Sequence, residues 1–221
     1  MIINAILISL KVVFIATFFS FMMGIILGRF FTKYDFKFKS LIETIILCPM
    51  FLPPSVLGYL LLILIGKNGI IGKFLYDTFK IQLVFTWQGA AIAAFVVSFS
   101  IMYNTCKSTF NSLNPCYEES AKVMGASEYI IFKDIILPLS KRGIITGLIL
   151  SFARAFGEFG ATIMVAGNIP SKTQTVPMAI YYAVESGNTK DANIMMIFTI
   201  VLGMLLVIIT NKILKNVNTY N

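Results

Sequence analysis

The sequence predicts an all-α integral membrane protein with about five transmembrane helices. Its composition is 57% hydrophobic and 13% charged, against roughly 45–50% and about 25% in soluble domains. Its apolar runs are long enough to cross a bilayer. Its Lys and Arg residues collect between these runs, as topology and anionic lipid require, rather than in a nucleic-acid-binding patch. A soluble enzyme and a disordered chain are excluded, and no interaction with nucleic acid is expected.

Five stretches meet the requirement of about 20 helical residues for a hydrocarbon core of about 30 Å. They cover residues 5–28, 43–65, 84–105, 143–166 and 192–211. Residues 174–186 contain Pro177 and are too short to cross, so they are expected to dip into the membrane or lie on its surface. The chain, residues 1–221, is predicted to be a single transmembrane domain.

The first three spans carry distinct packing signals. The first has a small residue at every fourth position, Ser20, Gly24 and Gly28, which lets another helix approach closely. The second contains Pro53-Pro54, which removes two backbone donors and predicts a kink. The third begins with a Gly/Ala-rich face that is also suited to close packing.

The distribution of Lys and Arg orients the chain. Eleven of these residues lie after the first span, between the third and fourth spans and in the tail, whereas five lie in the other loops. The positive-inside rule places the eleven in the cytosol. The N-terminus is therefore expected outside and the C-terminus in the cytosol, with Lys11 near the outer end of the first span.

The cytosolic segment between the third and fourth spans, residues 106–142, is the longest polar stretch. It predicts one short helix that follows Asn114-Pro115 and stops at Gly125, and a second run that ends at Pro138. Taken alone, such a segment is compatible with an ordinary connecting loop.

The spacing in this segment is more specific. Glu119-Ser120-Ala121, then Gly125, Ile135 and Leu137-Pro138 reproduce the pattern E-A-A-x3-G-x9-I-x-L-P, with Ser for the first Ala. This pattern resembles the signature of permease subunits of ABC importers. The resemblance implies a coupling helix that inserts into an ATPase subunit, formed by Glu118, Glu119, Ser120, Ala121, Gly125, Ala126, Ile135, Leu137 and Pro138.

The sequence predicts no ATP-hydrolysing site in this chain. A phosphate-binding loop needs G-x-x-x-x-G-K-[ST], and the nearest stretch, Gly66–Phe74, has the wrong glycine spacing. No catalytic residue, metal site or bound cofactor is therefore expected, and ATP and Mg²⁺ would belong to a partner ATPase. A channel or a secondary transporter remains the alternative from the residues alone, although neither needs a folded cytosolic segment.

The fourth span carries two ionisable groups, each of which is costly inside a membrane. Arg154 and Glu158 are four residues apart, hence on one helical face, and can neutralise each other. They are interpreted either as a structural ion pair or as a source of positive potential for an anion path.

Six blocks sharpen the resemblance to molybdate permeases of ABC importers. They are Pro49–Pro54, Leu61–Gly72, Phe85–Ala93, Gly157–Thr162, Gly167–Pro170 and Thr173–Tyr181. Sulfate and thiosulfate permeases share the G-E-F/Y-G core, so they stay an alternative, and a passive oxyanion channel is a second. The resemblance implies a type I importer fold with a path lined by Pro53, Pro54, Ser55, Arg154, Gly157, Glu158, Gly160, Thr162 and Asn168.

The resemblance also implies an assembly in the cell membrane of a prokaryote. The expected partners are a second copy of the chain, two ATP-binding ABC subunits, an extracytoplasmic molybdate-binding protein and membrane lipid. Tungstate is isosteric with molybdate, so the two anions are not separated at this level.

Overall fold

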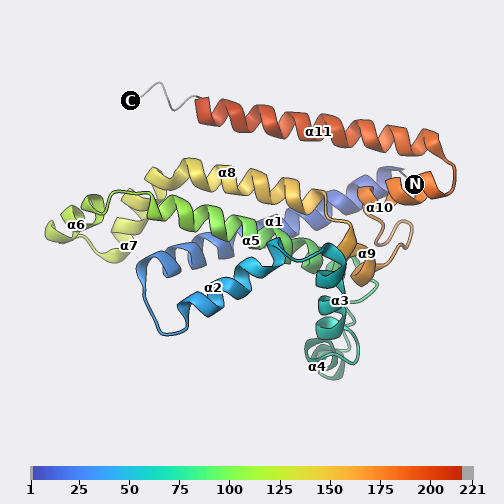
Figure 1. The fold of residues 1–221 in the computed structure, drawn as a ribbon, viewed down its shortest axis with the longest axis horizontal. Helices are drawn as coiled ribbons and strands as arrows, with labels where there is room; N and C mark the ends of the chain where they lie inside the picture. Colours follow the sequence, from blue (N-terminus) through green and yellow to red (C-terminus); the bar gives the residue numbers. More distant parts are fainter. Residues whose placement is uncertain (1, 216–221) are drawn as a thin grey trace.

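The computed structural model describes residues 2–215, and every regular element in that range is helical (Figure 1), which confirms the predicted all-α class. The elements are α1 (Ile2–Lys33), α2 (Lys39–Leu47), η1 (Cys48–Met50), α3 (Pro54–Ile65), α4 (Ile70–Phe79), α5 (Trp87–Asn111), α6 (Cys116–Val123), α7 (Glu128–Ile130), the π-helical turn η2 (Ile131–Ile136), α8 (Leu137–Phe156), α9 (Gly160–Ala166), α10 (Val176–Glu185) and α11 (Thr189–Lys215).

Helices α1, α5 and α8 lie side by side and form the body of the molecule (Figure 1). The small-residue row of α1 packs on α5: Ser20 Oγ lies 2.8 Å from Ser98 Oγ, 78 residues further along the chain. A Cβ on Gly24 would lie 2.5 Å from Cγ of Met102, and one on Gly28 would lie 3.0 Å from Cβ of Cys106. The constant offset shows that the two helices run in the same direction. The row therefore acts as a helix-packing surface, as its spacing predicts.

Four helices in the described range are long and apolar enough to cross a membrane: Ile2–Lys33, Trp87–Asn111, Glu128–Phe156 and Thr189–Lys212. A fifth crossing would use Lys39–Met50 together with Pro54–Ile65, which are bent by 118° relative to each other. The stretch 43–65 is therefore broken sharply rather than kinked. Pro53 is extended, with ψ 138°, and Pro54 opens α3, so neither proline can continue the preceding helix.

The predicted fourth span, residues 143–166, is also not one helix. The helix ends at Phe156, and the chain restarts as α9 at Gly160. At the other end the expectation that Pro138 stops a helix is wrong, because helical structure runs from Glu128 through Pro138 to Phe156. The π-helical turn η2 comes directly before α8, and Leu137 N–H donates to Phe132 O. The wider turn accommodates a proline that would break a regular α-helix.

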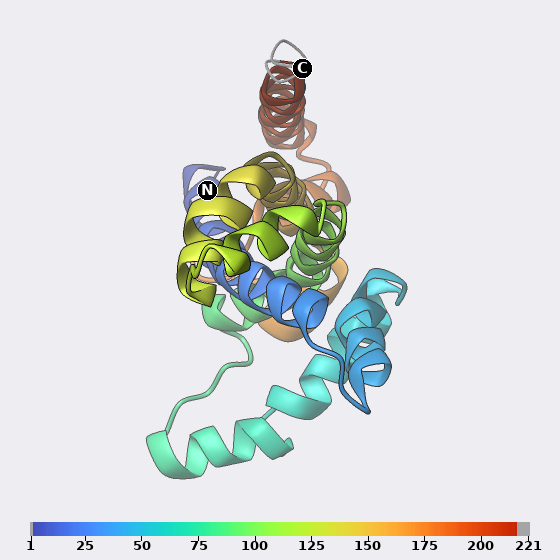
Figure 2. The same cartoon turned by 90° about the vertical axis from the view of Figure 1, so that its left-hand side faces the viewer.

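The remaining helices surround this body. Residues 176–185 form α10, which packs against α1 and α11 and is too short to cross a bilayer. Helices α3 and α4 project from one side, and α11 lies on the opposite side, where only its first half packs against α8 and α10 (Figure 2). The core lies where α1, α5 and α8 meet, and it holds Val13, Ala90 and Ala155.

Candidate functional site

The segment between the third and fourth predicted spans, residues 106–142, folds in its first half as the sequence predicts. Asn114 Oδ1 accepts a hydrogen bond from Cys116 N–H at 3.0 Å at the start of α6. The helix ends before Gly125, whose φ of +80° favours glycine. Ala126 N–H then donates to Ala121 O at 3.0 Å, which closes the turn. Residues 116–126 are therefore a compact helix and turn at one end of the molecule (Figure 1).

This segment is tied to the end of α1 by charge. Arg29 Nη1 and Nη2 donate to the two carboxylate oxygens of Glu118, each at 2.7 Å. Lys33 pairs with Glu128, and Lys122 lies 3.7 Å from the same carboxylate. The Arg29 guanidinium lowers the pKa of Glu118. Glu118 thus anchors the segment to the membrane-spanning body.

The outer surface of the same segment is apolar, and no other part of residues 2–215 covers it. Val123 is 89% exposed and Met124 is 78% exposed. A Cβ on Gly125 would meet no atom within 4 Å, and the side chain of Glu119 is exposed. An exposed apolar tip on a charged anchor is typical of a protein-docking surface. The sequence pattern includes Glu119 and Gly125, which are exposed on this tip, but not Val123 and Met124, whose only signal is two apolar residues at a helix end.

The other predicted coupling residues lie behind this tip. Ala121 is buried, Ala126, Ile135 and Leu137 pack against the same apolar cluster, and Pro138 lies in the first turn of α8. Ser120 is exposed on α6, with its Oγ 3.6 Å from Cys116 Sγ. Apart from Ser120, these residues form the base of the segment rather than its outer surface.

Two of the predicted path regions meet where helices are interrupted. A Cβ on Gly160, the first residue of α9, would lie 2.6 Å from Cβ of Pro54, the first residue of α3. One turn further on, a Cβ on Gly58 would lie 2.9 Å from Cα of Ala161. Two glycines therefore allow α3 and α9 to cross in close contact.

Arg154 and Glu158 form an ion pair, with Nη1 and Oε2 2.7 Å apart. The expectation that they lie on one helical face is wrong, because α8 ends at Phe156 and Gly157 caps it. Glu158 is 3% exposed, and its Oε1 accepts Ala161 N–H at 2.9 Å. The carboxylate thus joins the last turn of α8 to the first turn of α9, which neutralises its charge and satisfies a free helix donor.

The other predicted path residues are dispersed. Pro53 and Ser55 are exposed at the helix break, and Thr162 is buried within α9. Asn168 lies beyond α9, where its Oδ1 accepts from Gln174 Nε2 at 2.9 Å. It lines a cavity of about 280 Å³ together with residues of α10 and α11. The structure therefore does not place Asn168 with Pro54 and Gly160.

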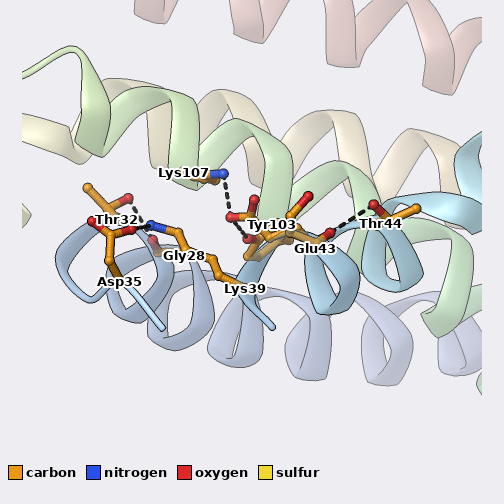
Figure 3. A network of polar contacts seen from close by, with 9 residues as sticks. Gly28, Thr32, Asp35, Lys39, Glu43, Thr44, Tyr103 and Lys107 are labelled. Carbon is orange, nitrogen blue, oxygen red and sulfur yellow. Dashed lines mark hydrogen bonds and ion pairs between the residues drawn. The ribbon is translucent and has the colours of Figure 1, made fainter. Parts of the chain in front are cut away.

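A further polar cluster was not predicted. Glu43 of α2 accepts a hydrogen bond from Tyr103 at 3.0 Å and pairs with Lys107, both on α5 (Figure 3). Ser100 Oγ also donates to Ile46 O at 2.6 Å. These contacts attach the first half of the bent pair to the body. Glu43 is a lone carboxylate at the start of an apolar run, and a carboxylate in that position needs a partner; this was the sequence feature that could have indicated the cluster.

Known proteins that this chain resembles are membrane components of transport systems. A family profile described as "Binding-protein-dependent transport system inner membrane component" matches residues 20–219. The molybdenum transport system permease protein ModB of Escherichia coli K12 is 40% identical over 94% of this chain and 91% of its own. The sulfate transport system permease protein CysT of Salmonella typhimurium is 34% identical over 80% of this chain and 64% of its own. An inward-facing structure of the MetNI methionine ABC transporter matches with a TM-score of 0.75 at 15% identity, over 97% of this chain and 95% of the other.

Proposed function

Because this chain belongs to the family of binding-protein-dependent transport system inner membrane components, we propose that it is the permease subunit of an ABC importer for molybdate or tungstate. The proposed substrate rests on the 40% identity to a molybdenum permease over nearly the whole chain. Sulfate is the second candidate, supported by the 34% identity to a sulfate permease over a shorter stretch.

In this proposal the permease works as a homodimer with two ATP-binding subunits, which hold ATP and Mg²⁺, and with an extracytoplasmic binding protein. The N-terminus lies outside, so the end of the molecule that carries α6 faces the cytosol. Val123 and Met124 then enter a groove on the ATPase subunit, while Glu118 keeps the segment attached to α1.

The anion path in this proposal follows the broken helices. Irregular backbone at membrane depth is tolerated where it faces protein or a watery cavity. The break at Pro53-Pro54 and the break at Gly157–Phe159 supply such backbone from two different helices. Arg154 is a cation in the last helical turn before the second break, and its side chain is 35% exposed while it pairs with Glu158. It can attract an oxyanion without trapping it.

The substrate is tested in proteoliposomes that contain the permease, its ATPase and its binding protein. We expect ATP hydrolysis to rise when the binding protein carries molybdate or tungstate and to stay basal with sulfate. Stimulation by sulfate alone would move the chain to the sulfate class. An assembled complex that no anion stimulates would refute both substrates.

The coupling role is tested separately by co-purification of the ATPase. Met124→Asp places a charge on the exposed tip and should abolish co-purification without unfolding the permease, because Met124 is 78% exposed. Ile70→Asp is the matched control, since Ile70 is 84% exposed on α4, far from the tip. Equal co-purification of both variants would show that the tip does not dock the ATPase.

A further inference from the structure

Two adjoining cavities follow the contact between α1 and α5 near their N-terminal ends. The first, called the polar cavity after its two lysines, holds about 400 Å³ and has a mixed lining, in which Lys11, Lys172 and Ser171 lie beside Ile8 and Phe85. The second holds about 350 Å³ and is apolar, with Ile15, Phe19, Met23, Ala91 and Phe95 in its lining. Both cavities share Trp87 and Gln88, so a polar chamber continues directly into an apolar groove.

The polar cavity lies at the level of a membrane interface. Lys11 and Arg29 are separated by 18 residues of α1, or about 27 Å, close to the thickness of a hydrocarbon core of about 30 Å. Trp87 and Lys107 bracket a similar length of α5, about 30 Å. Lys11 Nζ lies 3.6 Å from the centre of the Trp87 ring, which holds both side chains at one depth. Tryptophan is enriched at this level of membrane proteins.

The apolar groove extends from this level into the hydrocarbon region. Because α1 and α5 run in the same direction, residues 15, 19 and 23 of α1 and residues 91 and 95 of α5 descend together. Residues at these spacings lie on one face of each helix. The groove therefore has the direction and lining of a site for a lipid acyl chain.

The charge of the polar cavity is uniformly positive. Lys11 and Lys172 line it, and no Asp or Glu of the described range lines either cavity. The loop that carries Lys172 is fixed on both sides: Asn4 Nδ2 donates to Ser171 Oγ at 2.8 Å, and Thr173 Oγ1 donates to Gly167 O at 2.9 Å. The second lysine is thus held at the cavity rather than on a free loop.

From the continuity of these two cavities we infer a specific site for one anionic phospholipid, in the leaflet that faces the N-terminal end of α1. The phosphate group lies between Lys11 and Lys172, and the hydroxyl group of Ser171, which accepts a hydrogen bond from Asn4, is available as a donor. One acyl chain occupies the groove beside Phe19 and Phe95. The lipid fills the space between two parallel helices of the body.

The test uses the whole permease, purified with its ATPase in detergent, and native mass spectrometry to count retained lipid. Phosphatidylglycerol and phosphatidylcholine with identical acyl chains are added in separate samples. We expect the preference for phosphatidylglycerol to fall about 25-fold in Lys11→Gln/Lys172→Gln, since each lysine near the surface contributes about 5-fold. Lys67→Gln/Lys73→Gln removes the same charge near α4, where Lys67 also lies over an aromatic ring, and should leave the preference unchanged.

Two further arms use soluble anions with no acyl chain, glycerol 3-phosphate and molybdate. We expect neither to displace retained phosphatidylglycerol at equal concentration, because neither can occupy the apolar groove. Displacement by either anion would show a soluble oxyanion site instead of a lipid site. Equal retention of the two lipids by the unchanged protein would also overturn the inference. These readouts do not depend on which anion is transported.

Discussion

Gly160 provides a direct test of the close crossing of α3 and α9. A Cβ at this position would lie 2.6 Å from Cβ of Pro54, whereas carbon atoms pack at about 3.5–4.0 Å. The overlap of about 1 Å cannot be relieved by a rotamer change, since Pro54 is a ring fixed to the backbone. Gly160→Ala should therefore force the two helices apart at a cost of about 2 kcal/mol.

The loss should appear as a fall of about 4–8 °C in the thermal unfolding midpoint of the purified permease, followed by circular dichroism. Gly157→Ala is the control three residues away. A Cβ there would lie 3.6 Å from Ala153 O, an ordinary contact, and φ is −84°. This variant should change the midpoint by less than about 2 °C. Equal midpoints for Gly160→Ala and the unchanged protein would refute the close crossing.

Two other predictions follow from the ion pairs. Arg154→Leu leaves the buried Glu158 carboxylate without its partner and should strongly reduce the yield of folded permease, measured by size-exclusion chromatography. Arg154→Leu/Glu158→Gln should restore the yield, because Gln keeps an acceptor for Ala161 N–H. Equal yields of the two variants would contradict this prediction. Glu118→Gln should destabilise the protein by about 1–3 kcal/mol at neutral pH. Because Arg29 lowers the pKa of Glu118, the stability that the ion pair contributes is complete above the ordinary carboxyl pKa of about 4.3 and is lost as the pH falls further. The unfolding midpoints of Glu118→Gln and the unchanged protein should therefore converge at acid pH. A gap that stays constant with pH would refute the pairing.

Features with a local spacing signal could be predicted from the sequence. The row Ser20, Gly24 and Gly28 indicates a packing face because its period matches one helical turn, and α5 occupies that face. The turn at Gly125 follows from the same kind of local pattern. Pro138 was misread because the rule that proline ends a helix does not foresee a π-helical turn just before it.

Features that join distant parts of the chain could not be predicted. Arg29 and Glu118 are 89 residues apart, and Glu43 and Lys107 are 64 residues apart. The first pair is set by how α6 lies against α1 and the second by how α2 lies against α5, which one sequence does not reveal. The position of Asn168 could not be predicted for the same reason. Its motif suggested that it lines the anion path, but the loop after α9 brings it next to Gln174 instead.

The uninterrupted helical body from Glu128 to Phe156 has a mechanical consequence. Its 29 residues make a rod of about 42 Å. One end adjoins the exposed tip through Lys122 and Glu128, and the other end holds Arg154, whose ion pair with Glu158 leads directly into α9. A tilt of about 10° pivoting at the first end would displace the second by about 7 Å. A small change in the tilt of this helix is therefore a larger displacement at the broken helices than at the exposed tip.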